Sequence, residues 1–131
     1  MAVFVDGIRA SMSSTSASLA FVFPGQGSQS VGMLTELAAA HPEVRATFEE
    51  ASQGAGVDLW SLRSAGPEEQ LNRTENTQPA LLAASVAVWR VWRKLDGAQP
   101  AQLSGHSLGE YSALVCAGSL SLHDAAALVA E

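Results

Sequence analysis

The stretch AQLSGHSLG, residues 101–109, decides the fold of this 131-residue chain. A short run, Ala101–Ser104, precedes a Gly-X-Ser-X-Gly pattern, after which Tyr111 and Val115 continue at helical spacing. The pattern is typical of a nucleophile elbow, a sharp strand-to-helix turn that exposes a serine hydroxyl and leaves no room for side chains two positions away on either side. The sequence therefore predicts a strand, a tight turn and a helix, with Ser107 as the candidate nucleophile.

A second strand is expected near the start of the chain. Leu19–Phe23 is a continuously apolar run closed by Pro24-Gly25, which predicts a buried parallel strand inside a sheet. The loop Gly25–Ser28 follows it, at the position where parallel sheets place ligand sites. A phosphate cradle is disfavoured, because Ser30 stands where a third glycine would be needed. The loop is better suited to supply a second oxyanion donor.

Helical patterns fill most of the chain between these strands. A segment carrying Leu34 and Leu37 is stopped by His41-Pro42, which opens another helix that ends near Gly54 and Gly56. Residues 57–76 are expected to be loop with short helical turns.

The clearest helical pattern is Pro79–Leu95, with Thr77 or Gln78 as its cap and Gly97 as the left-handed residue at its end. Ser121–Asp124 predicts a capping box for a last helix.

Strands separated by long helical segments predict an α/β domain, with a parallel sheet and flanking helices, over residues 19–131. The last helical pattern reaches Glu131 without a cap, so we expect a sheet that is incomplete at that point. Residues 1–18 lack the basic and apolar regions of a secretory signal and end in a serine-rich stretch, which predicts a disordered leader.

Composition disfavours several classes of partner. A net charge of -6 would repel a polyphosphate backbone, so nucleic acid is not expected as a partner. The longest apolar run, Ala80–Trp89, is about half of the roughly 20 residues that a membrane span needs, so no membrane helix is expected. Cys116 is the sole cysteine, which excludes an internal disulfide and a cysteine-rich metal site and favours a cytoplasmic setting.

Three ordered motifs resemble the malonyl-CoA:acyl carrier protein transacylases. They are FPGQGSQ at Phe23–Gln29, NTQPAL at Asn76–Leu81 and GHSLGEYSAL at Gly105–Leu114. The resemblance runs from Leu19 to the last residue, and it implies an α/β-hydrolase-like acyltransferase core that stops before the family's small inserted subdomain. It also implies malonyl-CoA as substrate, acyl carrier protein as partner, fatty acid biosynthesis as the setting, and no metal or cofactor.

The resemblance assigns roles to individual residues. Ser107 would take the acyl group as an ester, the backbone amides of Gln26 and Leu108 would form the oxyanion hole, and Gln78 would lie near the site. The family's catalytic histidine, and the arginine that grips the malonyl carboxylate, would lie beyond Glu131. The isolated chain is therefore expected to be inactive and to act with a complementary C-terminal half.

Alternatives stay open. His106 is a candidate base, but adjacent residues on an elbow do not normally face each other, so we expect a structural or hydrogen-bonding role for it at the site. His41 and His123 are expected to be capping or solvent-facing residues, and Cys116 a core thiol. A serine esterase or thioesterase would keep the same elbow, and a non-catalytic half of a split or truncated enzyme is a third interpretation.

Overall fold

The computed structural model contains a three-stranded sheet, which includes both strands predicted from the sequence. The structure describes residues 2–4 and 18–131. The strands are β1 (Ala2–Phe4), β2 (Ala20–Phe23) and β3 (Gln102–Gly105), in the order β1-β3-β2. β2 runs parallel to β3, with Phe23 opposite Gly105, whereas β1 runs antiparallel to β3. The predicted parallel strand pair is thus confirmed.

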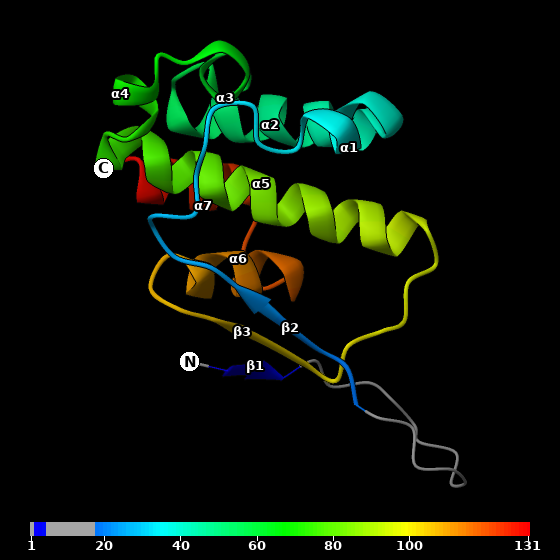
Figure 1. Cartoon of the computed structure of the whole chain (residues 1–131). Coiled ribbons are helices and arrows are strands. Elements are labelled where there is room, and N and C mark those ends of the chain that lie inside the picture. Colours follow the sequence, from blue (N-terminus) through cyan, green and yellow to red (C-terminus); the bar gives the residue numbers. More distant parts are fainter. Residues whose placement is uncertain (1, 5–17) are drawn as a thin grey trace, which may run out of the picture.

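The prediction that β2 lies inside the sheet is wrong for the described part of the chain. β2 forms an edge, and Val22 is 74% exposed, while Phe23 on the opposite side of the strand is 4% exposed. A continuously apolar run predicts a strand that is buried on both faces. Among the described residues, β2 has one neighbouring strand, β3, and helices cover one face of the sheet (Figure 1).

Seven helices are described, and they lie on one side of the sheet (Figure 1). The predicted helix pair before Gly56 is confirmed, and the region expected to be loop with helical turns forms two short helices. The helices are α1 (Thr35–Ala40), α2 (Pro42–Ala55), α3 (Leu59–Ala65), α4 (Glu68–Leu71), α5 (Thr74–Lys94), α6 (Gly109–Cys116) and α7 (Leu122–Val129).

Helix α5 starts at Thr74, five residues before the predicted start at Pro79. Pro79 lacks an N–H and so cannot donate to the preceding turn. Proline is therefore favoured in the first turn of a helix, and this preference led to the prediction that α5 begins at Pro79. The turn before Pro79 is stabilised by a hydrogen bond to the segment that precedes α5, because the Thr77 hydroxyl donates to the carbonyl of Leu71 at 2.5 Å. Neither Thr77 nor Gln78 is therefore the cap; the N-cap position belongs to Arg73.

The end of α5 also differs from the prediction. The left-handed residue is Asp96, with φ 56°, and not Gly97. Gly97 instead lies against the indole of Trp92, where an added Cβ would fall 2.2 Å from a ring carbon, and the Trp92 Nε1–H donates to the carbonyl of Ala98 at 3.0 Å. A glycine is needed here for close approach and not for backbone conformation.

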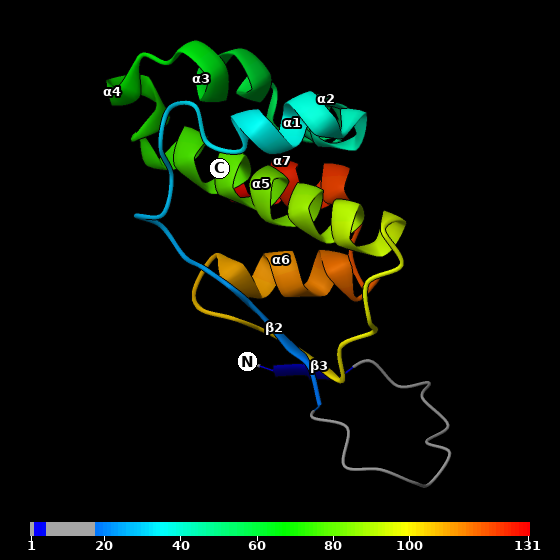
Figure 2. The same cartoon turned by 45° about the vertical axis from the view of Figure 1, so that its right-hand side comes forward.

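The main core lies among α2, α5 and α7, away from the sheet (Figure 2). Val44 and Phe48 of α2 and Leu82 of α5 are fully buried in it. A smaller cluster of Phe23, Leu103 and Ala113 fixes α6 against the sheet. The helix after the elbow is therefore held by the two strands that flank the candidate site.

Two remaining expectations concern the ends of the chain. The predicted disordered leader over residues 1–18 falls largely on residues 1 and 5–17, which lie outside the described residues; of the rest, Ala2–Phe4 form β1. The cap predicted at Ser121 is confirmed, since its hydroxyl accepts from the Asp124 N–H at 3.0 Å; that hydroxyl also donates to the Asp124 carboxylate at 2.7 Å. Within the described ranges, no helix is long and apolar enough to cross a bilayer.

Candidate active site

Ser107 occupies the turn between β3 and α6. β3 ends at Gly105 and α6 begins at Gly109, so the reversal takes place within three residues. Ser107 is exposed and has φ 53°, a left-handed conformation that non-glycine residues rarely adopt. Strained backbone of this kind is concentrated at functional sites, where the surrounding structure holds it in place. The predicted elbow geometry is therefore present.

The two glycines of the motif have the predicted steric role. A Cβ on Gly105 would lie 2.0 Å from the carbonyl carbon of Gly109, and a Cβ on Gly109 would lie 2.2 Å from the carbonyl oxygen of Phe23. Both distances are far below van der Waals contact, so any side chain would force the strand and helix apart. The glycines allow α6 to start directly over the end of β2.

The loop after β2 reaches the elbow. A Cβ on Gly25 would lie 3.0 Å from the His106 carbonyl oxygen and 3.6 Å from the Ser107 Cβ, which places the Gly25 backbone beside the serine. Within the described part of the chain, the N–H groups of Gln26 and Leu108 donate no hydrogen bond to protein. The Leu108 N–H follows Ser107 directly, and the Gln26 N–H follows Gly25, whose backbone lies beside the serine; N–H groups without a protein partner can donate to a substrate oxyanion.

Gln78 lies on the helix that this loop touches. It is half-buried in α5, and the Gln26 side chain donates from Nε2 to Thr74 Oγ1, at 3.4 Å, one turn earlier in that helix. The loop after β2 thus touches both the elbow, through Gly25, and the first turn of α5, through Gln26, and Leu108 is 3% exposed.

A further pair of residues, which the sequence analysis missed, holds the loop. Gln29 Oε1 accepts from the Gly27 N–H at 2.8 Å, and Gln29 Nε2 donates to Asn72 Oδ1 at 2.8 Å. The side chain therefore ties the loop that carries the Gln26 amide to the segment between α4 and α5. The signal available in the sequence was the second glutamine of FPGQGSQ, but its partner lies 43 residues away.

His106 has a structural part in the turn. Its N–H donates to the Phe23 carbonyl at 3.3 Å and its carbonyl accepts from the Gly109 N–H at 2.9 Å, so its backbone links both strands to α6. Among the described residues, no histidine forms a hydrogen bond with the Ser107 hydroxyl. His41 stands between α1 and α2, and the exposed His123 pairs with Asp124 at 3.3 Å. None of the three is placed as a base for Ser107.

Neither a catalytic thiol nor a metal centre is supported among the described residues. Burial raises the pKa of the Cys116 thiol to about 12, which keeps it protonated near neutrality and unreactive. No group of His, Cys, Asp and Glu side chains that could hold a metal ion occurs within the described ranges.

Comparison with known proteins identifies relatives of this chain. Residues 20–131 match the acyl transferase domain family. The malonyl CoA-acyl carrier protein transacylase of Salmonella typhimurium is 64% identical over 110 residues, which are 84% of this chain and 36% of that protein. The Bacillus subtilis (strain 168) transacylase is 49% identical over 107 residues, 82% of this chain and 33% of its own length.

Solved structures give the same result. The chain is similar to the malonyl-CoA:acyl carrier protein transacylase of Xanthomonas oryzae, with 69% identity and a TM-score of 0.86 over 89% of this chain and 37% of that one. It is also similar, at 60% identity and a TM-score of 0.84, to a structure of a type II polyketide acyl-carrier protein in complex with its malonyl-transacylase, covering 87% and 37% of the two chains. The chain thus spans only about a third of the length of these relatives, and by its match over residues 20–131 it belongs to the acyl transferase domain family.

Proposed function

We propose that this chain carries the nucleophile and the oxyanion hole of an enzyme that transfers malonyl from coenzyme A to acyl carrier protein in fatty acid biosynthesis. The observation that carries the proposal is an exposed Ser107 on a strained turn, next to the unengaged amide of Leu108 and beside the Gly25 loop, which also carries the unengaged amide of Gln26. The relatives named malonyl transacylases, and the one solved with an acyl-carrier protein, support the choice of acyl group and acceptor.

The reaction has two steps on one residue. The Ser107 Oγ attacks the malonyl thioester carbonyl and gives its proton to a base, and the carbonyl electrons return to expel coenzyme A as its protonated thiol. The phosphopantetheine thiol of the carrier protein then attacks the Ser107 ester and its proton returns to the serine oxygen. Each of the two amides would stabilise the oxyanion in both steps, and one such donor is worth about 3 to 4 kcal/mol to the transition state.

The base and the group that binds the malonyl carboxylate are proposed to come from polypeptide outside this chain. Within the described part of the chain, the Ser107 hydroxyl has no histidine partner. Loss of the base costs a serine enzyme roughly a millionfold in kcat, about 8 kcal/mol. We therefore expect negligible turnover from the 131 residues by themselves. A reducing, cytoplasmic setting is part of the proposal, favoured by a sequence with one cysteine and hence no internal disulfide framework.

A hydrolase with the same elbow is the alternative function. In a hydrolase, water and not the thiol of the carrier protein would cleave the acyl-enzyme. The test supplies the missing polypeptide by co-expressing the chain with the remainder of the Salmonella transacylase, and follows malonyl-CoA with and without acyl carrier protein. Malonyl recovered on the carrier protein supports the proposal. Free malonate at the same rate with or without carrier protein would establish the hydrolase.

A further inference from the structure

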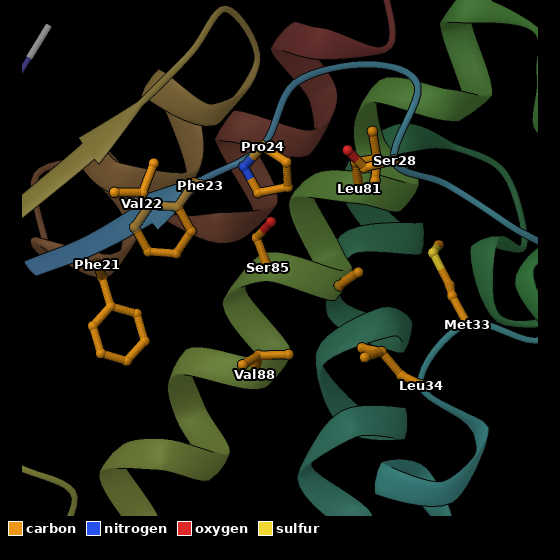
Figure 3. Close-up of a pocket in the computed structure, with 11 residues that line it drawn as sticks. Phe21, Val22, Phe23, Pro24, Ser28, Met33, Leu34, Leu81, Ser85 and Val88 are labelled. Atoms are coloured by element: carbon orange, nitrogen blue, oxygen red, sulfur yellow. The ribbon is translucent and has the colours of Figure 1, made fainter.

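The loop between β2 and α1 has little backbone structure of its own. Within the described part of the chain, the backbone of residues 25–29 forms no hydrogen bond with other backbone. Pro24 and Ser28 of this loop and Leu81 of α5 border an apolar groove of about 330 Å³, so packing against α5 does not fill the space beside the loop (Figure 3). Side-chain hydrogen bonds are therefore the specific contacts that orient the loop.

The orientation of this loop matters because the loop carries the Gln26 N–H. The Gly27 N–H, one peptide further on, donates to Gln29 Oε1 at 2.8 Å. Gly27 has φ 109°, a conformation that residues with a side chain rarely adopt, so this turn depends on its glycine. Because the peptide unit is planar, fixing the Gly27 N–H leaves only the torsions of Gln26 to set the direction of the Gln26 N–H. The Gln29 side chain therefore constrains the amide proposed for the oxyanion hole.

Asn72 in turn holds Gln29. The Asn72 Oδ1 accepts from Gln29 Nε2 at 2.8 Å, and within the described part of the chain the Asn72 side chain has no other hydrogen-bond partner. The backbone of Asn72 has a separate role, since its N–H donates to the Glu68 carbonyl at 2.9 Å and ends α4. A change of the Asn72 side chain therefore breaks the bridge to Gln29 and leaves the end of α4 intact.

The first two residues of the NTQPAL motif anchor Asn72 to α5. The Asn76 Nδ2 donates to the Gln70 carbonyl at 2.9 Å. The Thr77 hydroxyl donates to the Leu71 carbonyl at 2.5 Å. Gln70 and Leu71 immediately precede Asn72 in the chain. Thr77 and Leu71 are fully buried, so this anchor belongs to the core, and it gives Asn72 a fixed position relative to α5.

We propose that Asn72 is a positioning residue for acyl transfer, which acts through Gln29 to orient the Gln26 N–H toward the oxyanion. This rests on the proposed function, in which that amide stabilises the oxyanion in both steps. The oxyanion develops in the transition state and is absent from the bound thioester, so loss of the bridge lowers kcat and leaves KM unchanged. A role for Asn72 in binding malonyl-CoA would instead raise KM.

The test compares Asn72→Leu with Asn72→Asp in the chain co-expressed with the remainder of the Salmonella transacylase. Leucine removes the acceptor for Gln29 Nε2, whereas the aspartate carboxylate keeps one. Gln53→Leu is the matched control, because Gln53 is exposed on α2 and its side chain forms no hydrogen bond with other described residues. Circular dichroism of each variant chain verifies that it folds; if Asn72→Leu does not, Gln29→Leu breaks the same bridge from the other side.

We expect kcat for malonyl transfer to fall about fivefold in Asn72→Leu, the equivalent of one net hydrogen bond, with KM for malonyl-CoA unchanged. Asn72→Asp and Gln53→Leu should keep the wild-type kcat. Because Asn72 acts through Gln29, Asn72→Leu should lower kcat no further in a Gln29→Leu background. An unchanged kcat in Asn72→Leu, an effect on KM alone, an equal loss in Asn72→Asp, or a full additional loss in the double variant would each overturn the proposal.

Failure of the proposed function would be visible separately. A wild-type complex that never acylates Ser107 would refute that function, and NMR relaxation of the Gln26 amide in the chain by itself then tests the positioning. Greater mobility of this amide in Asn72→Leu than in Asn72→Asp would show that the bridge orients the loop. Equal mobility in the two variants would overturn the positioning role of Asn72.

Discussion

Gly109 packs directly onto the carbonyl oxygen of Phe23, so that a Cβ on Gly109 would lie 2.2 Å from it. This contact joins the start of α6 to the end of β2 and fixes the elbow between the two parallel strands. The position of Ser107 relative to the Gly25 loop therefore depends on a residue without a side chain.

Gly109→Ala tests this contact. Overpacking of this kind costs typically 1 to 3 kcal/mol, and here the neighbour is backbone that cannot rotate away. We expect the free energy of unfolding in urea to fall by about 3 kcal/mol. Gly118→Ala is the control, because its Cβ would meet nothing within 4 Å and its φ of 77° costs only about 1 kcal/mol of backbone strain. Equal losses for the two variants would mean that the close approach is not real.

The Gln29 bridge is testable in the chain by itself. Gln29→Leu removes the acceptor for the Gly27 N–H and the donor to Asn72, whereas Gln29→Glu keeps an acceptor oxygen for Gly27. A net hydrogen bond of about 1 kcal/mol corresponds to roughly fivefold in an equilibrium. We expect the Gly27 amide to exchange about fivefold faster in Gln29→Leu than in the wild type, by NMR. Unchanged exchange in the Leu variant would show that the side chain does not hold the loop.

Asp58 provides a pH-dependent contribution to stability. Its carboxylate caps α3, accepting from the Ser61 N–H at 2.9 Å and from the Ser61 hydroxyl at 2.7 Å, and these hydrogen bonds lower the pKa of Asp58. A lowered folded-state pKa stabilises the protein above the unfolded-state pKa, and the contribution is lost as the pH falls through the folded-state value. We expect Asp58→Ala to cost about 1 kcal/mol at pH 7. The difference from the wild type should shrink below pH 4; a difference constant down to pH 2 would contradict the capping role.

Cys116 should react slowly in the folded chain. With its pKa raised to about 12 by burial, only about one thiol in ten thousand is ionised at pH 8, and the thiolate is the nucleophile. We expect alkylation by iodoacetamide at pH 8 to be slower by three orders of magnitude or more than in urea-unfolded chain. Comparable rates in the two states would show that the thiol is accessible and the core around α6 open.

The parts of the fold that were predictable from sequence are those fixed by local sterics. Gly105 and Gly109 specify the elbow because each excludes a side chain through contacts within the turn or with the adjacent strand. The helix caps at Ser121 and Gly56 are equally local. The Gln29–Asn72 bridge could not be predicted, because it depends on how a loop and a segment 43 residues later come together.

The errors arose where tertiary packing overrides a local signal. Pro79 is a good first-turn residue, yet α5 begins at Thr74 because the Thr77 hydroxyl secures the turn before it. Glycine commonly ends a helix in the left-handed conformation, but here Asp96 adopts that conformation. Gly97 is instead packed against the Trp92 ring, which leaves no room for a side chain. The apolar run in β2 predicts a strand inside the sheet, but β2 lies at an edge of the described sheet, where Val22 is 74% exposed.

The central claim is that Ser107 is an acyl-accepting nucleophile whose base comes from other polypeptide. Its most direct test is intact-mass analysis after incubation with malonyl-CoA, for the chain alone, for the chain co-expressed with the remainder of the Salmonella transacylase, and for the Ser107→Ala variant of that complex. We predict a single malonyl adduct, located on Ser107, in the wild-type complex only. An adduct on the isolated chain, or one that persists in Ser107→Ala, would contradict the account.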